Sequence, residues 1–289
     1  VTGVQTCALP IFIKYINSTT EIFSRVAKLN SFAGEWVFCY RHNPPPSVEM
    51  YVVTHKKLPD SYVKNLPANY NLIHAGRALS ENLGYTGDNT GENISYLNPY
   101  LNEITALYWM YKNTSHTVIG LSHYRRFFTT SNDLNFSYEK IISAAEMVKI
   151  LEEYDIALVY HRDNVLQMEN LIIACGKNLV DLTENILKKH LMRLFPEYIE
   201  TLDLLLNTQI FYKCNMFFTR KFIFDAYCRW LFSFLIDVVK EVLQTTEIST
   251  FKGAKKRIIG YWAERMMTIF AMKNRLRIKE LNIMQVPEL

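Results

Sequence analysis

A histidine followed by two nearby arginines is the group in this chain best suited to chemistry. His123, Arg125 and Arg126 come at the end of a short apolar run, residues 118–122, that is typical of a buried strand. Ligands of open α/β sheets bind outside the carboxyl ends of the strands, so we expect these side chains at the ligand edge of a sheet. Two guanidinium groups there offer a forked set of donors suited to phosphate oxygens. The alternative interpretation is a solvated basic turn.

Three carboxylates are candidates for a catalytic base. Glu264 lies among aromatic residues, Glu103 lies inside an otherwise apolar helical pattern, and Asp88 lies in a loop rich in Gly, Asn and Asp. A carboxylate among apolar groups has a raised pKa and can accept a proton at neutral pH. The alternative for Glu264 and Glu103 is an ordinary ion pair.

Metal and cofactor motifs are weak in this chain. Three further apolar runs also end in a histidine, at His55, His74 and His161. His55, His123 and His161 could converge on a metal, but no spacing of the HExxH kind is present. The chain has no Asp-x-Asp pair, no GxGxxG after its first strand, no P-loop and no serine nucleophile elbow. The sequence therefore identifies no cofactor and leaves a divalent cation, Mn²⁺ or Mg²⁺, as an open alternative.

Alternating apolar runs and helical patterns predict an α/β fold. We expect a mostly parallel sheet with helices on both faces and a helix-rich C-terminal half. The expected strands are 50–55, 71–74, 118–123, 156–161 and one within 210–218. The expected helices are part of 12–40, then 98–113, 178–194, 197–206, 220–244 and 257–274.

The N-terminal region differs from the rest. Residues 41–47 contain three consecutive prolines, which indicate a linker, so we expect an N-terminal extension over 1–47 and a domain over 48–289. Residues 1–11, VTGVQTCALPI, resemble the translation of a sequencing adapter. We expect them to have no packed role and the natural chain to continue upstream.

Composition narrows the class of protein. Hydrophobic residues make up 49% and charged residues 21%, which excludes disorder as the main state. The net charge of +4 is too small to indicate a nucleic-acid partner. The cysteines show no pairing pattern and no long uncharged apolar run occurs, so we expect a cytoplasmic protein. Peripheral contact with the inner membrane is a further expectation, through the basic cluster Lys252, Lys255, Lys256 and Arg257.

Several segments together resemble the DUF4422 family of capsular and exopolysaccharide glycosyltransferases. The resemblance covers roughly residues 49–275, and its most specific part is the helix at 98–109 followed by HYRRFF at 123–128. The chain has Trp262 where the family usually has leucine. The segments that carry the resemblance are 51–56, 87–95, 98–109, 119–128, 214–217 and 260–265.

This resemblance implies a GT-A-like, Rossmann-related fold that transfers a sugar from a nucleotide-sugar donor to a growing surface polysaccharide. The donor would be a UDP-hexose, with UDP-galactofuranose as one candidate, and the acceptor a saccharide or a lipid-linked saccharide. Carried over by motif position, four sets of residues receive roles. These are Thr54 and His55 at the nucleotide, Asp88, Asn89 and Asn93 at the donor sugar or ribose, His123, Arg125 and Arg126 at the diphosphate, and Asn215 near the acceptor.

Because no Asp-x-Asp pair holds a metal, Arg125, Arg126 and His123 are expected to neutralise the departing diphosphate directly. Glu264 or Glu103 would take the acceptor proton if the reaction inverts, with Asp88 as a third candidate. Two other classes stay open: a nucleotidyl or phosphoryl transferase, which would also use the arginines, and a non-catalytic sugar-binding module, which the aromatic content suits.

Overall fold

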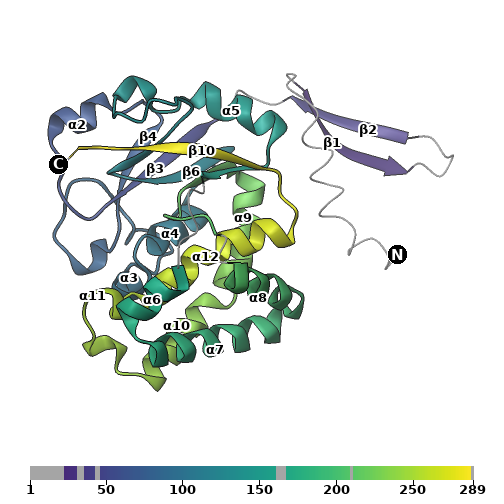
Figure 1. Ribbon diagram of the computed structural model, residues 1–289. Helices are drawn as coiled ribbons and strands as arrows, with labels where there is room; N and C mark the ends of the chain where they lie inside the picture. The colour runs from purple at the N-terminus through teal and green to yellow at the C-terminus, as the bar shows by residue number, and fades with distance from the viewer. Residues whose placement is uncertain (1–22, 31–35, 43–45, 161–166, 209–210, 288–289) are drawn as a thin grey trace.

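The computed structural model describes residues 23–30, 36–42, 46–160, 167–208 and 211–287. Its centre is an eight-stranded sheet of order β5-β4-β3-β6-β7-β10-β8-β9, in which β6 also pairs with β9. Helices cover both faces of this sheet (Figure 1). The fold is therefore mixed α/β with two helical layers.

One half of the sheet is parallel. It consists of β3 (Val48–Thr54), β4 (Tyr70–His74), β5 (Thr86–Gly87) and β6 (Val118–His123). Helices cover both sides of β3, β4 and β6. Because both faces of these strands are buried, their sequences are nearly continuous apolar runs. Their carboxyl ends meet at one edge, as the sequence predicts. The predicted domain start also coincides with the start of β3, although the division into extension and domain stays a prediction.

The other half is mixed, so the prediction of a mostly parallel sheet was wrong for this part. It consists of β7 (Arg126–Thr129), β8 (Ile156–Val159), β9 (Phe217–Arg220) and β10 (Ile278–Gln285). Strands β8 and β10 pair in parallel, whereas β7 and β9 are antiparallel to their neighbours. The difference arises because β7 returns from β6 in a tight hairpin and β10 comes from the C-terminal end of the chain. Neither strand was predicted.

Alternate residues of the strands face opposite helical layers. Met50 and Phe218 face a core covered by α2 (Asp60–Asn65) and α5 (Ala144–Glu153). Tyr51 and Phe217 face a larger core on the other side. Figure 1 shows that this second side carries α4 (Ile104–Asn113), α9 (Lys221–Phe232) and α12 (Ile258–Lys273).

Outer elements complete the helical half. The longer ones are α6 (Gln167–Cys175), α7 (Lys177–Leu194), α8 (Ile199–Thr208) and α10 (Leu235–Thr245). The short ones are α3 (Asn98–Leu101), α11 (Gly253–Lys256), η1 (Arg77–Leu79), η2 (Ser95–Leu97), η3 (Tyr138–Lys140), η4 (Pro196–Tyr198) and η5 (Ile248–Thr250).

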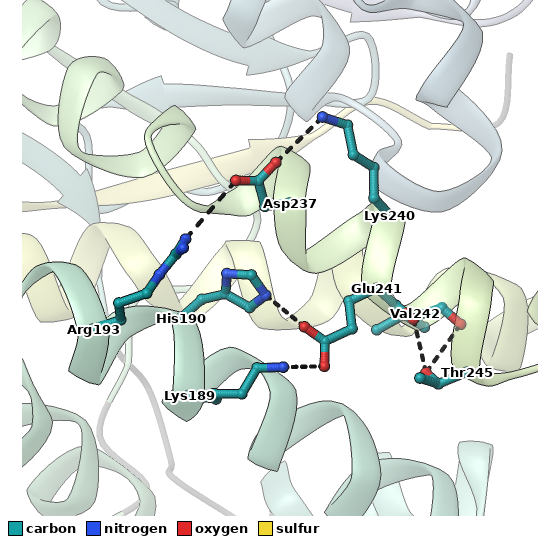
Figure 2. A network of polar contacts seen from close by, with 8 residues as sticks. All are labelled: Lys189, His190, Arg193, Asp237, Lys240, Glu241, Val242 and Thr245. Carbon is teal, nitrogen blue, oxygen red and sulfur yellow. Dashed lines mark hydrogen bonds and ion pairs between the residues drawn. The ribbon is translucent and has the colours of Figure 1, made fainter.

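Helix α12 runs through the larger core, and polar contacts fasten the outer helices around it. Trp262 is 1% exposed, and its Nε1 donates to Thr183 Oγ1 of α7 at 2.9 Å. On the surface, Glu241 of α10 accepts from Lys189 and, at 2.8 Å, pairs with His190 Nε2 of α7 (Figure 2). This contact joins α7 to α10.

Two predicted helices are interrupted. The pattern over 98–113 breaks at Asn102, whose φ of +51° ends α3, so Glu103 lies at the start of α4 and not inside a helix. The expected helix over 220–244 divides into α9 and α10 near Ser233. The break at Asn102 matters for the site, because it turns the Glu103 side chain toward the edge of the sheet.

The helix expected within residues 12–40 was wrong for the residues that the structure describes. These form the antiparallel pair β1 (Phe23–Asn30) and β2 (Trp36–His42). The aromatic and β-branched residues of 36–40 favour strand, which overrides the weak helical periodicity before them. Residues 1–22 lie outside the described part.

Within the described residues, no helix is long and apolar enough to cross a membrane.

Candidate active site

The carboxyl edge of the sheet holds two chemically different groups of side chains. We call the first the cationic group; its members are His55, Lys56, Tyr124 and Arg125. We call the second the carboxylate group; its members are Glu103, His123, Cys214, Asn215 and Glu264. Both depend on β6 and the hairpin that follows it.

In the cationic group, the ring of Tyr124 is the common contact. Lys56 Nζ lies 5.2 Å and Arg125 Cζ 5.3 Å from its centroid, and the His55 ring meets it edge-on at 5.7 Å. The backbone carbonyl of Tyr124 accepts from Tyr62 Oη at 2.6 Å, which fixes this turn from the buried side. Both His55 and Arg125 are exposed. Two cations held on an aromatic face at the ligand edge form a site suited to an anion.

The electrostatics of His55 agree with an anion-binding role for the cationic group. Although His55 is exposed overall, partial desolvation of its ring lowers its pKa, and the positive charges of Lys56, Arg125 and Arg257 lower it further. The imidazole is therefore neutral at pH 7, and the charge of the cationic group comes from Lys56 and Arg125. Arg257 occupies the N-cap position of α12, so this member of the basic cluster expected at a membrane acts near the sheet edge.

Thr54, expected to line the nucleotide site, is fully buried at the end of β3. Its hydroxyl accepts from Lys56 N at 3.2 Å and donates to Lys56 O at 2.9 Å. This local turn directs the chain out of the sheet. The structure thus gives Thr54 the role of positioning Lys56.

The carboxylate group is built around the turn at Cys214 and Asn215. Glu264 accepts a hydrogen bond from the backbone N–H of Cys214, and Glu103 Oε1 accepts from Asn215 Nδ2 at 2.6 Å. His123 Nε2 lies 2.5 Å from the carbonyl oxygen of Cys214. Four of the eleven candidate residues, Glu103, His123, Asn215 and Glu264, are therefore brought together from β6, α4, α12 and the segment before β9.

Glu264 has the electrostatics expected of a base. Burial raises its pKa, and the nearby charge of Glu103 raises it further. The N–H of Cys214 and the cations Arg265 and Arg126 oppose this shift without cancelling it. A carboxylate in this setting binds a proton more readily than one in water.

A small hollow adjoins the carboxylate group. It has room for about one water molecule, and Glu103 and Asn215 are its polar lining residues. The remaining walls are apolar: Ile104, Leu107, Leu121, Phe217, Tyr227 and Met267. The hollow is therefore a small, mostly apolar space beside the carboxylate group.

The structure separates the two adjacent arginines. His123 pairs with Arg126 across the hairpin, which leaves Tyr124 and Arg125 as its turn. Arg125 therefore joins the cationic group, whereas the charge of Arg126 acts on Cys214 and Glu264. His123, Arg125 and Arg126 do not form one three-residue cluster.

Asp88, expected at the donor sugar or as a base, is fully buried in the structure. Its two oxygens accept from Gly76 N at 2.9 Å, Arg77 N at 3.0 Å, Thr105 Oγ1 at 2.6 Å and Ser95 Oγ. With four donors already bound, the carboxylate anchors the loop and is not placed to take a substrate proton.

The asparagines of this loop differ from each other. Asn93 Nδ2 donates to the carbonyls of Asn89 at 3.1 Å and Gly91 at 2.9 Å, and its Oδ1 accepts from Ser95 N at 3.2 Å. Asn93 is thus used within the loop, whereas Asn89 is exposed. Of the three residues predicted as ligands in this loop, Asp88 is buried, Asn93 is half-buried and Asn89 is exposed.

Among the described residues, no three His, Cys, Asp or Glu side chains are grouped as metal ligands. Glu103 and Glu264 are only two, and each already accepts a hydrogen bond from the 214–215 turn. Asp155 lies at the amino end of β8, the opposite edge of the sheet, and accepts from Arg277 at 2.9 Å. His161 lies outside the described residues. The described residues at this edge therefore do not provide a ligand set for a divalent cation.

Sequence reasoning did not assign Lys56, Tyr124 or Cys214. A signal existed for the first two, because Lys56 follows a strand-end histidine and Tyr124 stands between His123 and Arg125. No feature of the sequence marked the backbone groups of Cys214, because every residue except proline has both a backbone N–H and a carbonyl.

The fold resembles that of a known glycosyltransferase. The apo structure of the bifunctional glycosyltransferase WbbM superposes with a TM-score of 0.69 and 28% sequence identity, over 84% of this chain and 46% of the WbbM chain. The chain thus spans about half the length of WbbM. No curated protein matches it. Residues 49–275 match the family described as "Domain of unknown function (DUF4422)", and the chain therefore belongs to the DUF4422 family.

Proposed function

We propose that this protein is a glycosyltransferase that moves a hexosyl group from a UDP-sugar to a saccharide or lipid-linked acceptor of surface polysaccharide assembly. The observation that carries the proposal is the pairing, at one sheet edge, of a cationic group with a carboxylate of raised pKa. Glycosyl transfer with inversion needs both: positive charge at a leaving diphosphate and a base at the acceptor hydroxyl.

In the proposed reaction, Lys56 and Arg125 bind the diphosphate oxygens. The acceptor oxygen forms a bond to the anomeric carbon, while the bond from that carbon to the diphosphate oxygen breaks and its electron pair leaves with UDP. The acceptor proton passes to the carboxylate of Glu264. Positive charge fixed beside the leaving group stabilises the transition state without reorganisation.

Glu103 and Asn215 have a different proposed role. They lie near Glu264 at the 214–215 turn, where Asn215 Nδ2 donates a hydrogen bond to Glu103 Oε1. We assign them to orienting the acceptor sugar, whose hydroxyls need both donors and acceptors. Asn89, exposed on the anchored loop, is assigned to the donor sugar or ribose.

The nature of the donor is a finer part of the proposal. UDP-galactofuranose is one candidate and pyranose UDP-hexoses are others. A screen by thermal shift, followed by a hydrolysis assay without acceptor, tests the reaction class. We expect one UDP-sugar to stabilise the protein and to be cleaved slowly to UDP and free sugar.

Other products would contradict this function. Release of UMP or phosphate would indicate phosphoryl or nucleotidyl transfer, and binding of saccharides without any effect of UDP-sugars would indicate a binding module. Activity lost in EDTA and restored by Mn²⁺ would transfer the leaving-group role from Lys56 and Arg125 to a metal.

Contact with the cytoplasmic face of the inner membrane is a separate part of the proposal. It rests on the charges of Lys252, Lys255 and Lys256 in and beside α11, which suit anionic headgroups. Co-sedimentation with anionic liposomes that is reduced when the three lysines are replaced by glutamine would support it. Unchanged co-sedimentation would remove it.

A further inference from the structure

The turn that joins the two carboxylates is strained. Cys214 has a φ of +75° and Asn215 a φ of +51°, so two consecutive residues with a Cβ adopt the left-handed conformation. Asparagine visits this region more readily than most residues, but cysteine has no such preference. Strained backbone persists where surrounding contacts impose it, and such places are concentrated at functional sites.

Three hydrogen bonds impose this conformation, each from a different element. His123 at the end of β6 binds the carbonyl of Cys214, Glu264 of α12 binds its N–H, and Glu103 of α4 binds the Asn215 side chain. A carbonyl can only accept, so His123 Nε2 must carry the proton and donate it. That nitrogen is therefore occupied and is not available to a diphosphate.

His123 also links the two groups of the site. It precedes Tyr124 and Arg125 in the chain, and its ring reaches the turn that orients Glu264. The carbonyl that His123 binds and the N–H that donates to Glu264 both belong to Cys214, so a shift of the carbonyl would also move the N–H. The position of the base thus depends on the strand that ends at the diphosphate site.

We infer that His123 is a positioning residue: by donating to the Cys214 carbonyl it holds the strained 214–215 turn in the conformation that aims Glu264 at the acceptor. This role rests on the proposed function for its catalytic consequence, whereas the restraint on the turn does not. It replaces the expectation that His123 contacts the diphosphate.

A double-substitution cycle tests the restraint. Glycine adopts positive φ without strain, so Cys214→Gly should make the turn stable without help from His123. We expect His123→Ala to lower both the melting temperature and kcat, the latter by about 10-fold or more, and Cys214→Gly to recover much of both losses in the double variant. Additive losses in the double variant would overturn the inference.

Two further measurements separate positioning from diphosphate binding. The Kd for UDP and the KM for the donor should stay within about twofold in His123→Ala, since only kcat depends on the base. His123→Gln places an amide Nε2–H at a similar reach and should restore kcat. A loss of UDP affinity that matches the loss of kcat, or no rescue by glutamine, would overturn the inference.

Failure of the proposed function can be distinguished from failure of the inference about His123. If no UDP-sugar binds or reacts with the wild-type protein, the proposed function fails. The melting temperatures of the four proteins in the cycle still decide whether His123 restrains the turn. Where His123→Ala unfolds, the cycle is completed with His123→Leu in the Cys214→Gly background, and continued failure to fold there contradicts the restraint.

Discussion

Glu241 and Glu264 are the same residue type in two opposite settings. Glu241, on the surface between α7 and α10, binds Lys189 and His190, and these bonds lower its pKa (Figure 2). Glu264, at the edge of the sheet, binds a neutral backbone N–H, and burial with the charge of Glu103 raises its pKa. Partners that carry positive charge keep a carboxylate ionised, whereas burial beside another carboxylate makes it ready to accept a proton.

This difference in pKa indicates a structural role for Glu241 and a chemical role for Glu264. The contacts of Glu241 join two helices and leave no reason for proton exchange. Glu264 gains little from its surroundings as an anion, so its burial costs stability at neutral pH. Enzymes place such costly groups where chemistry requires them.

Substitution of each glutamate by glutamine gives the largest expected contrast. Glu264→Gln keeps an oxygen that accepts from Cys214 N–H but removes the base, so we expect transfer to fall by about 10²–10⁴-fold. Glu241→Gln should leave the rate unchanged. Initial rates with saturating donor check this, and a Glu264→Gln variant that transfers sugar at the wild-type rate would remove the base assignment.

The second largest effect concerns the cationic group. Arg125→Ala removes a cation held on Tyr124, so we expect transfer to fall by about 10²-fold and the Kd for UDP to rise. Arg193→Ala is the matched control, because Arg193 is an exposed arginine near Asp237 at 4.0 Å on the outer helices. Equal UDP affinities in the two variants, measured by calorimetry, would show that Arg125 does not bind the diphosphate.

A smaller effect is expected from Glu103→Gln. The variant keeps an oxygen for Asn215 Nδ2 but loses the charge that raises the Glu264 pKa. The base must be deprotonated to act, so activity declines as pH falls through its pKa, and this decline should move to lower pH in the variant. A pH–rate profile checks the shift. Loss of activity at every pH would instead identify Glu103 as the base.

The smallest expected effect is on the free energy of unfolding, which the two glutamine substitutions should change in opposite directions. The folded-state pKa of Glu264 is raised, so its contribution to stability is lost as pH rises through that value, and Glu264→Gln should be at least as stable as the wild type at pH 7. The folded-state pKa of Glu241 is lowered, so its contribution is present at neutral pH and lost on acidification. Glu241→Gln should therefore be destabilised, by less than about 1 kcal/mol because the pair is at the surface. Urea unfolding at pH 7 measures both, and the same sign in both variants would contradict the comparison.

The parallel half of the fold was predictable because buried parallel strands are continuous apolar runs in the sequence. The runs that end at His55, His74 and His123 are β3, β4 and β6, and the edge they share is where the candidate site lies. Strands β7 and β10 were not found because a four-residue strand after a tight turn and a strand with mixed polar residues lack a distinct period. The mixed character of the sheet follows from these two strands.

The site was predictable in its residue types and less so in its grouping. Glu103, Asn215 and Glu264 come together with His123, which was expected beside Arg125 and Arg126 instead. The two arginines separate because the hairpin register points neighbours in different directions. Asp88 illustrates the opposite error. A carboxylate in a polar loop resembles a ligand in sequence, and only the four donors around it reveal an anchor.

The most direct test of the central claim is a titration of the two carboxyl groups by ¹³C NMR, with Glu264→Gln and Glu241→Gln providing the assignments. We expect Glu264 to titrate above the ordinary glutamate value of 4.5 and Glu241 below it. A Glu264 carboxyl that titrates at or below 4.5 would contradict the claim that this residue is held ready as the base.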